Sequence, residues 1–140
     1  MGFILFIVAM LILAIAVTVN SVFLPLYYIT SFKWKQGVKR LDLFFYKLAL
    51  SIDQFGNVFC AGLFNRILIE KDGFKYGDED DTISYVTARN QYKGTLKVCG
   101  IILAVVLELV DKGHLDKSIY NKQQRDNEAV KRFSENKYFE

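Results

Sequence analysis

The side chains that could form a catalytic set are few in this sequence, and they lie far apart along the chain. His114 is its only histidine, and Asp53 and Ser84 are the other two candidates. A histidine can act as a general base and a serine as a nucleophile when the two lie within about 3 Å of each other. The sequence shows no nucleophile elbow and no glycine-rich oxyanion turn around them. We therefore assign no catalytic residue, and keep His114, Asp53 and Ser84 as candidates if the protein is an enzyme.

His114 has further polar neighbours along the chain. Asp111 or Asp116 could orient its ring, and Ser118 would share its face if a helix covers both. The alternative is a histidine at the start of a helix after Gly113, where it caps the helix or contacts lipid headgroups. The sequence alone leaves both interpretations open.

Metal and cofactor sites are not expected. No Cys-x-x-Cys or His-x-x-x-His spacing occurs, and structural zinc sites need such clusters. The acidic run from Asp78 to Asp81 could attract calcium, but the EF-hand spacing is absent, so we expect a solvated loop and a helix cap. There is no Walker loop and no Gly-x-Gly-x-x-Gly. A net charge of +3 gives no reason to expect nucleic acid.

A polar seam is the most informative feature of the middle of the chain. Asp53, Asn57, Ala61 and Asn65 are spaced four apart, beside an apolar stripe at spacings of four or three: Phe44, Leu48, Ile52, Phe55, Phe59, Leu63 and Ile67. Polar groups in a membrane-facing helix are costly unless paired. The seam could be structural, facing water or pairing with Lys47 or Arg89. Alternatively, Asp53, Asn57 and Asn65 bind a partner or a second subunit.

The elements that position these residues begin with an uncharged segment. All 18 basic and 15 acidic side chains lie from Lys33 onward. The stretch from Phe3 to Leu24 is long enough to cross about 30 Å of hydrocarbon as a helix, and Pro25 could kink or end that helix. This distribution is untypical of a plain soluble globule and of a multi-pass transporter. We expect a single-pass transmembrane anchor over 1–32.

Basic residues follow the anchor directly. Lys33, Lys35, Lys39 and Arg40 form a positive flank that would lie at the membrane surface. The positive-inside rule then places the N-terminus outside and the C-terminal unit in the cytoplasm. Ala14-Ile15-Ala16 also fits a signal-peptide cleavage site, but no Lys or Arg precedes the apolar run. A cleaved, exported protein is therefore a lesser alternative, as is a buried core helix.

The remaining elements are expected to be helical, giving an all-α fold with a small membrane-associated helical unit after the transmembrane helix. We expect helices near 42–68, with a break near Gly56 or Gly62, and near 96–110. A loop at 70–81 leads to a short helix from Thr82 to about Asn90, capped by Asp80 or Asp81. We divide the chain into an anchor (1–32), a membrane-proximal helical unit (33–115) and a polar helical tail (116–140).

The two cysteines give no sign of a disulfide framework. Cys60 and Cys99 each lie within an apolar run. Small secreted domains that depend on disulfides carry more cysteines than this. We expect two reduced, buried thiols that pack as small hydrophobic side chains.

Three short segments carry a resemblance to a family. The segment Leu48-Ala49-Leu50-Ser51-Ile52-Asp53-Gln54-Phe55-Gly56-Asn57 resembles a stretch in small uncharacterised membrane proteins encoded by bacteriophages and prophages of Gram-negative bacteria. Asp80-Asp81-Thr82-Ile83-Ser84 and the spaced residues Asp111, His114, Ser118 and Ile119 are similar to further stretches of that family. The resemblance covers roughly residues 46–119. It implies a phage or prophage origin and the bacterial inner membrane, and it brings no reaction, cofactor or catalytic residue.

These patterns predict a non-enzymatic membrane protein. It would act through contacts with a host or phage membrane protein, or through self-assembly as a homo-oligomer, in the lipid bilayer. Superinfection exclusion, an accessory role in lysis, or a structural role in a membrane-associated particle would fit. The alternative function is a membrane-anchored hydrolase acting on lipid or another interface substrate.

Overall fold

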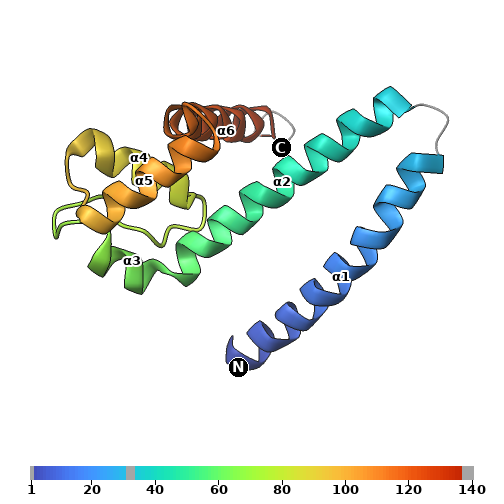
Figure 1. Ribbon diagram of the computed structural model, residues 1–140, viewed down its shortest axis with the longest axis horizontal. Helices are drawn as coiled ribbons and strands as arrows, with labels where there is room; N and C mark the ends of the chain where they lie inside the picture. The colour runs from blue at the N-terminus through green and yellow to red at the C-terminus, as the bar shows by residue number, and fades with distance from the viewer. Residues whose placement is uncertain (1, 31–33, 137–140) are drawn as a thin grey trace. The chain divides into compact units, whose positions relative to one another are not determined.

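The computed structural model describes residues 2–30 and 34–136. Within these ranges the chain forms six helices and no strand: α1 (Gly2–Thr30), α2 (Trp34–Phe59), α3 (Ala61–Ile67), α4 (Ile83–Lys93), α5 (Val98–Val110) and α6 (His114–Asn136) (Figure 1). The chain divides into two compact units, Met1–Leu48 and Ala49–Glu140. The predicted all-helical class with one N-terminal apolar helix is confirmed.

α1 is an unbroken helix of 29 residues that continues past Pro25. Its stretch Gly2–Leu24 is long and apolar enough to cross a membrane, and no part of it is buried within the structure. Three polar side chains interrupt the apolar surface. Thr18, Asn20 and Ser21 each donate a hydrogen bond to the carbonyl four residues earlier, at 2.8, 2.9 and 2.7 Å. Each side chain therefore finds its partner inside its own helix.

The predicted helix near 42–68 is two helices, α2 and α3, and the first begins as early as Trp34. The break falls at Cys60, between the two glycines where we expected it. The Cys60 amide still donates to the Gly56 carbonyl at 2.9 Å, and the Cys60 carbonyl accepts from the Phe64 amide at 2.8 Å. The helix direction changes here while these backbone hydrogen bonds are kept.

The segment between α3 and α4 is irregular, as predicted for 70–81. It is fixed to the start of α5 by a short antiparallel pairing around Ile69 and Leu96. The Glu70 amide donates to the Thr95 carbonyl at 2.9 Å, and the Lys97 amide donates to the Leu68 carbonyl at 2.8 Å. These bonds satisfy backbone groups that would otherwise be left unpaired in the interior.

α4 is capped at both ends by residues that the sequence only partly revealed. The cap at its N-terminus is Thr82, whose hydroxyl oxygen accepts from the Tyr85 amide at 3.1 Å. The predicted cap at Asp80 or Asp81 is therefore wrong, because extended backbone at Thr82 places that side chain over the first turn. Gly94 ends α4 with a φ of 69°, in the left-handed region that favours glycine.

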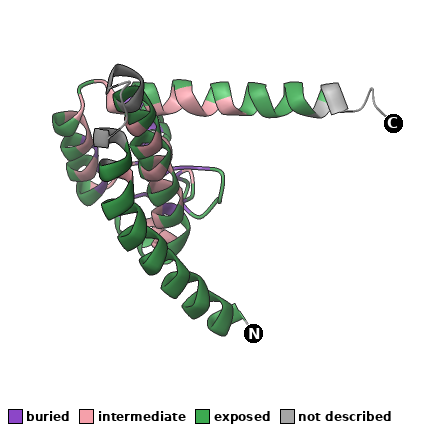
Figure 2. Ribbon diagram, turned by 90° about the vertical axis from the view of Figure 1, so that its right-hand side faces the viewer, coloured by how far each residue is buried: buried purple, intermediate pink, exposed green. Residues whose placement is uncertain are grey.

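The core of the second unit lies around α4, which packs against both α5 and α6. Leu68, Ile69, Tyr76 and Val86 form one buried cluster, and Ala88, Ala104 and Leu115 form another. α5 approaches the chain after α3 so closely that a Cβ at Gly100 would lie 2.3 Å from the Leu68 carbonyl oxygen. Figure 2 shows how few residues are buried, and how the second half of α6 extends beyond the other helices of this unit.

α6 begins at His114 and includes the start of the predicted polar tail. Both carboxylate oxygens of Glu108 accept backbone hydrogen bonds at this turn, from Gly113 at 2.8 Å and from Leu115 at 2.9 Å. A carboxylate is favourable at a helix N-terminus because it compensates the exposed amides and their dipole. Glu108 therefore fixes where α6 leaves α5.

The two cysteines are free thiols, but neither is buried as expected. Cys60 is half-buried, whereas Cys99 is exposed. The expectation fails for Cys99 because the apolar run around it is an outward-facing part of α5, rather than a core segment.

Candidate functional site

The polar seam faces the loop that precedes α4. Asn57 donates to the Asp78 carbonyl at 2.7 Å and to the Asp81 carbonyl at 3.1 Å, and it accepts from the Gly77 amide at 3.3 Å. Its side chain has no exposed surface. Because all of these partners lie in the same chain, Asn57 holds the loop in place and has no surface to offer a second molecule.

Asn65 continues this pairing along the loop. Its amide nitrogen donates to the Tyr76 carbonyl at 2.9 Å, and its oxygen accepts from the Tyr76 amide at 2.8 Å. The side chain thus imitates a backbone partner for one residue of the loop. The phenol of Tyr76 in turn hydrogen-bonds the Thr87 hydroxyl at 2.9 Å, and burial raises the pKa of Tyr76.

A third asparagine, in α4, also hydrogen-bonds the backbone of the loop, and it was not predicted from the sequence. Asn90 accepts from the Phe74 amide at 2.7 Å and donates to the Phe74 carbonyl at 2.8 Å. Its oxygen also accepts from the Thr95 hydroxyl at 2.7 Å. Asn90 is fully buried. Its position one turn before Gly94 was a weak signal, because nothing in the sequence predicted that the loop would pack there.

Asp53, Ser84 and His114, the three reactive candidates, meet in space. One carboxylate oxygen of Asp53 accepts from the Ile83 amide at 3.0 Å, and the other accepts from the Ser84 hydroxyl at 2.8 Å. His114 Nε2 lies 3.0 Å from Ser84 Oγ, and His114 Nδ1 lies 3.3 Å from Asp111 Oδ2. A chain of hydrogen bonds therefore runs from α2 through the start of α4 to the start of α6.

The number of protons limits which of these hydrogen bonds can form at the same time. Ser84 has one hydroxyl proton, and the hydrogen bond to Asp53 uses it. His114 must then donate from Nε2 to Ser84, and its contact with Asp111 is a hydrogen bond only if Nδ1 also carries a proton. In the other arrangement, Nδ1 donates to Asp111 and Nε2 accepts the proton of Ser84. Asp53 then loses that bond and keeps the Ile83 amide.

The surroundings of Ser84 limit what this set can do. Ser84 is only 3% exposed. The N-terminus of α4 donates to both carboxylate oxygens of Asp53, and Arg89 lies over the Phe74 ring, 5.3 Å from its centroid. Ser118 and Asp116 lie outside this hydrogen-bonded chain, since Ser118 donates to the Leu115 carbonyl at 2.6 Å and Asp116 accepts from the Tyr92 hydroxyl.

A second polar contact holds α6 against the loop. Lys122 lies 3.2 Å from both Asp81 and Asp126. Burial raises the pKa of Asp81, and the hydrogen bond and attraction to Lys122 offset only part of that rise. Burial alone would lower the pKa of Lys122, but its two carboxylate partners outweigh it and raise that pKa. Within the acidic run, Asp81 therefore takes part in holding α6 against the loop.

The described residues contain no group of three or more His, Cys, Asp or Glu side chains that could hold a metal ion. Within the acidic run, Asp78 accepts from the Asp80 amide at 2.9 Å. The Asp81 carboxylate pairs with Lys122 instead of joining its neighbours. Within the acidic run, the Asp78 carboxylate therefore serves a local turn and the Asp81 carboxylate serves packing.

The basic flank is only partly described. Lys33 lies outside the described residues, and the side chain of Lys35 is not described either. Lys39 and Arg40 lie in α2 and are exposed. Their positive charges are therefore available to solvent or to a surface.

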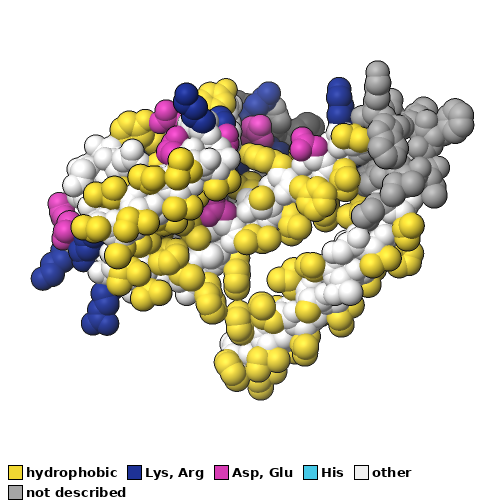
Figure 3. Space-filling view, viewed as in Figure 1, with side chains coloured by type: hydrophobic (Ala, Val, Ile, Leu, Met, Phe, Trp, Pro, Cys, Tyr) yellow, Lys and Arg dark blue, Asp and Glu magenta, His cyan; other side chains and the backbone are white. Residues whose placement is uncertain are grey.

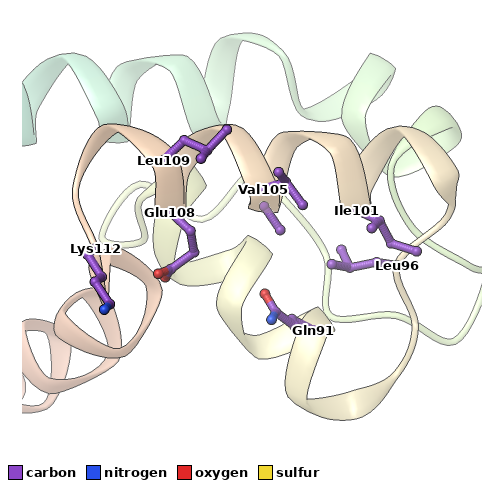
Figure 4. Close-up of a pocket in the computed structure, with 8 residues that line it drawn as sticks. Gln91, Leu96, Ile101, Val105, Glu108, Leu109 and Lys112 are labelled. Carbon is purple, nitrogen blue, oxygen red and sulfur yellow. The ribbon is translucent and has the colours of Figure 1, made fainter.

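An apolar surface on α5, within the predicted helix near 96–110, is the other candidate site. A groove of about 590 Å³ lies between α4 and α5, with Leu96, Ile101, Ala104 and Val105 among its apolar lining residues. Gln91, Glu108 and Lys112 add polar groups (Figure 4). The outer face of α5 is exposed as well, with Leu109 80% exposed.

Comparisons with known proteins add no family. No family model matches the chain, and neither a curated protein nor a solved structure is similar to it.

Proposed function

We propose that this protein is a single-pass membrane protein that acts without catalysis, through protein contacts made in and at the membrane. The observation that carries the proposal is α1. It presents apolar side chains outward over the whole stretch Gly2–Leu24, and none of this surface is buried by the rest of the described chain. Such a surface is stable in hydrocarbon and costly in water.

The polar side chains of α1 support the same conclusion. In the bilayer core, a polar group without a partner costs several kcal/mol, on the order estimated for unsatisfied backbone groups. Thr18, Asn20 and Ser21 are each hydrogen-bonded to a carbonyl of the preceding turn. The hydroxyl donors of Thr18 and Ser21 and one amide donor of Asn20 can therefore enter a membrane without a partner from another helix.

The proposed orientation follows from the charges after α1. Lys39 and Arg40 are exposed, and basic residues beside a span favour the cytoplasmic side. The N-terminus would then be outside and the second unit in the cytoplasm. The resemblance of residues 46–119 to phage and prophage proteins stays a prediction, and it adds the bacterial inner membrane as the expected location.

The use of the polar residues in folding supports a non-enzymatic role. Asp53, Asn57 and Asn65 hold α2 and α3 to the loop and to α4, and Ser84 is nearly inaccessible. We propose that self-assembly through the exposed apolar surface of α1 is the principal contact. To test it, two differently tagged full-length copies would be co-expressed and isolated through one tag from membranes in mild detergent.

Recovery of the second tag is the expected result of that experiment. The control mixes membranes from cells that each express one tag, and here the second tag should be absent. Absence of the second tag from co-expressing cells would contradict self-assembly.

A second candidate function, a membrane-anchored hydrolase, is favoured by one distance. His114 Nε2 lies 3.0 Å from Ser84 Oγ, with Asp111 on the other ring nitrogen. Ser84 Oγ would attack an ester carbonyl as its proton passes to His114, which would return the proton to the departing alkoxide. The burial of Ser84 and the competing acceptor Asp53 place this candidate second.

Covalent labelling separates the two candidates. A fluorophosphonate probe should leave the membrane-embedded protein unlabelled if Ser84 is structural. Labelling that disappears in both Ser84→Ala and His114→Ala would establish the hydrolase. Ser134→Ala is the matched control, because Ser134 is exposed near the end of α6.

A further inference from the structure

The outward face of α5 is apolar from one end of the helix to the other. Gly100 and Ala104 turn toward the core and are buried. The other side of the helix carries large side chains at the surface, among them Val98 at 73% exposed and Leu109 at 80%. The exposed residues of this face are Val98, Cys99, Ile102, Val105, Val106, Leu109 and Val110. A soluble monomer rarely leaves a continuous surface of this kind uncovered.

A neighbouring helix extends this surface. Leu63 and Ile67 of α3 are exposed, and Phe64 of α3 and Leu103 of α5 pack on the same core cluster. Figure 3 shows hydrophobic side chains gathered over α5 and α3 on the face toward the viewer. We call the exposed residues of α5 listed above, together with Leu63 and Ile67, the α5–α3 surface.

Charges are placed at the ends of this surface rather than within it. Lys97 precedes α5 and donates to the carbonyl of Arg66, so two basic residues meet at one end. Lys112 follows the other end. The acidic residue of α5, Glu108, turns toward the amides of α6. Basic residues around an apolar surface are typical of helices that lie on anionic membranes.

We propose that the α5–α3 surface rests on the lipid bilayer, with α5 in the membrane interface and Lys97, Arg66 and Lys112 at the headgroup phosphates. This inference rests on the proposed membrane anchor, because α1 would hold the second unit close to the bilayer. α5 has 13 residues, or roughly 20 Å of helix, which is too short to cross about 30 Å of hydrocarbon. It therefore lies along the membrane.

The charges favour lipid over a second copy of the chain as the occupant. In a two-fold symmetric dimer, the same surface contacts itself. Antiparallel pairing of α5 would bring the lysine at one end onto the lysine at the other end of the second copy. Parallel pairing would bring like lysines together. Asp111, the acid beside Lys112, already pairs with His114 and Lys117. Phosphate headgroups would supply negative charge to the lysines at both ends.

Fluorescence quenching by lipid tests the inference on the full chain. Cys99 lies on the α5–α3 surface and is exposed, so a bimane label can be attached to it in a Cys60→Ala background. Ile102→Cys, in a chain with both native cysteines replaced by alanine, gives a second probe. The protein is reconstituted in vesicles of phosphatidylcholine and phosphatidylglycerol, with bromine on the acyl chains of the phosphatidylcholine.

Two further probes make the outcomes distinct. Leu11→Cys in α1 reports on the anchor, and Gln123→Cys on the exposed side of α6 is the control. We expect bromine to remove most of the fluorescence at positions 11, 99 and 102, and little at 123. Quenching at 11 without quenching at 99 or 102 would overturn the inference and leave the anchor intact. No quenching at 11 would overturn the anchor.

A dimer has its own pattern in the same experiment. Positions 99 and 102 would then be shielded from iodide in the water but would escape the bromine. This result would overturn the lipid contact and establish a second copy on the surface. Equal quenching by bromine at 99, 102 and 123 would also overturn the inference, because it would show no preference for one face.

Discussion

The two sides of the Ala49–Glu140 unit are made from opposite kinds of side chain. Toward the loop, polar residues are buried: Asn57 and Asn90 have no exposed surface, and both bind loop backbone. On the α5 side, large apolar residues such as Leu109 are exposed. In an ordinary soluble domain this distribution is reversed. The difference indicates that polar contacts hold the loop in place, while the apolar residues on the outer face of α5 are left for a contact outside the chain.

The kind of side chain found on each side has a physical reason. The loop has irregular backbone, and its amides and carbonyls need partners that no regular helix or sheet supplies. Asparagine suits this role because one side chain both donates and accepts. The α5 side needs no such partners, because the helix satisfies its own backbone. Substitution at the junction of the two sides should therefore have the largest effect, followed by substitutions on each side.

Gly100→Ala should have the largest effect, because Gly100 lies where the two sides meet. A new Cβ would lie 2.3 Å from the Leu68 carbonyl oxygen, which is backbone and cannot move aside alone. We expect a loss of about 3 kcal/mol of unfolding free energy, measured by pulse proteolysis in detergent. Gly62→Ala is the matched control, since nothing lies within 4 Å of its new Cβ. Equal stability of the two variants would show that α5 does not pack so closely.

Asn57→Ala tests the polar side directly. It removes three hydrogen bonds and leaves the Asp78 and Asp81 carbonyls and the Gly77 amide without that partner. A loss of about 2–3 kcal/mol is expected for buried polar groups left unpaired. Hydrogen exchange at the loop amides, with Asn127→Ala on the exposed part of α6 as control, provides the measurement. Unchanged protection at Gly77 would contradict the role given to Asn57.

Asp53→Ala should cost less, about 1 kcal/mol, the usual value for the loss of a helix cap. It removes the acceptor of the Ile83 amide and of the Ser84 hydroxyl. Chemical unfolding of Asp53→Ala, Ser84→Ala and the double variant would show whether the two residues act together. If their effects simply add, Ser84 is bonded elsewhere, and the hydrogen-bonded chain to His114 is not coupled through it.

Ile102→Glu tests the apolar side, and here the expected change is in membrane contact rather than stability. Ile102 is 58% exposed, so the unfolding free energy in detergent should change by less than about 0.5 kcal/mol. The bimane label on Cys99 should lose its quenching by brominated lipid. Tyr120→Glu on exposed α6 is the control. A large loss of stability in Ile102→Glu would mean that the residue is a core position.

The smallest effects are expected from pH, and two aspartates around α6 should act with opposite sign. The hydrogen bond from Lys117, followed by that from His114, lowers the pKa of Asp111. Its contribution to stability is therefore present above the ordinary aspartate pKa and is lost as pH falls through the lowered value. Burial raises the pKa of Asp81, so its contribution is complete below the ordinary value and is lost as pH rises through the raised one.

Hydrogen exchange at the start of α6 measures this difference across the acidic pH range. Asp111→Asn should remove the loss of protection at low pH near His114. Asp81→Asn should remove the change that occurs as pH rises. The same pH dependence in both variants would mean that neither pKa is shifted by the folded chain.

Local features of the fold could be predicted from the sequence, whereas most contacts could not. The absence of charge before Lys33 predicted α1, and Gly113 marked the start of α6, where its φ is positive. The sequence located the helix break only to the region of two glycines, Gly56 and Gly62, and the structure has it between them at Cys60. The sequence left open whether α5 is buried or exposed, because an apolar run has the same pattern whether it faces the core or the outside.

For the candidate site too, the residues could be predicted from the sequence but their contacts could not. Spacing predicted that Asp53, Asn57 and Asn65 lie on one face of a helix, but it could not show that this face meets the loop. His114 and Ser84 were named as reactive residues separately, and their approach to 3.0 Å spans 30 residues of sequence. Such a contact depends on how α4 and α6 pack, which no local pattern contains.

Membrane extraction with a topology reporter tests the central claim most directly. The full chain would carry a C-terminal reporter that is active only in the cytoplasm, and the membranes would be washed with alkaline carbonate. We predict that the protein resists the wash and that the reporter is active. Release of the protein by carbonate would contradict the α1 anchor, and a silent reporter on retained protein would contradict the cytoplasmic position of the second unit.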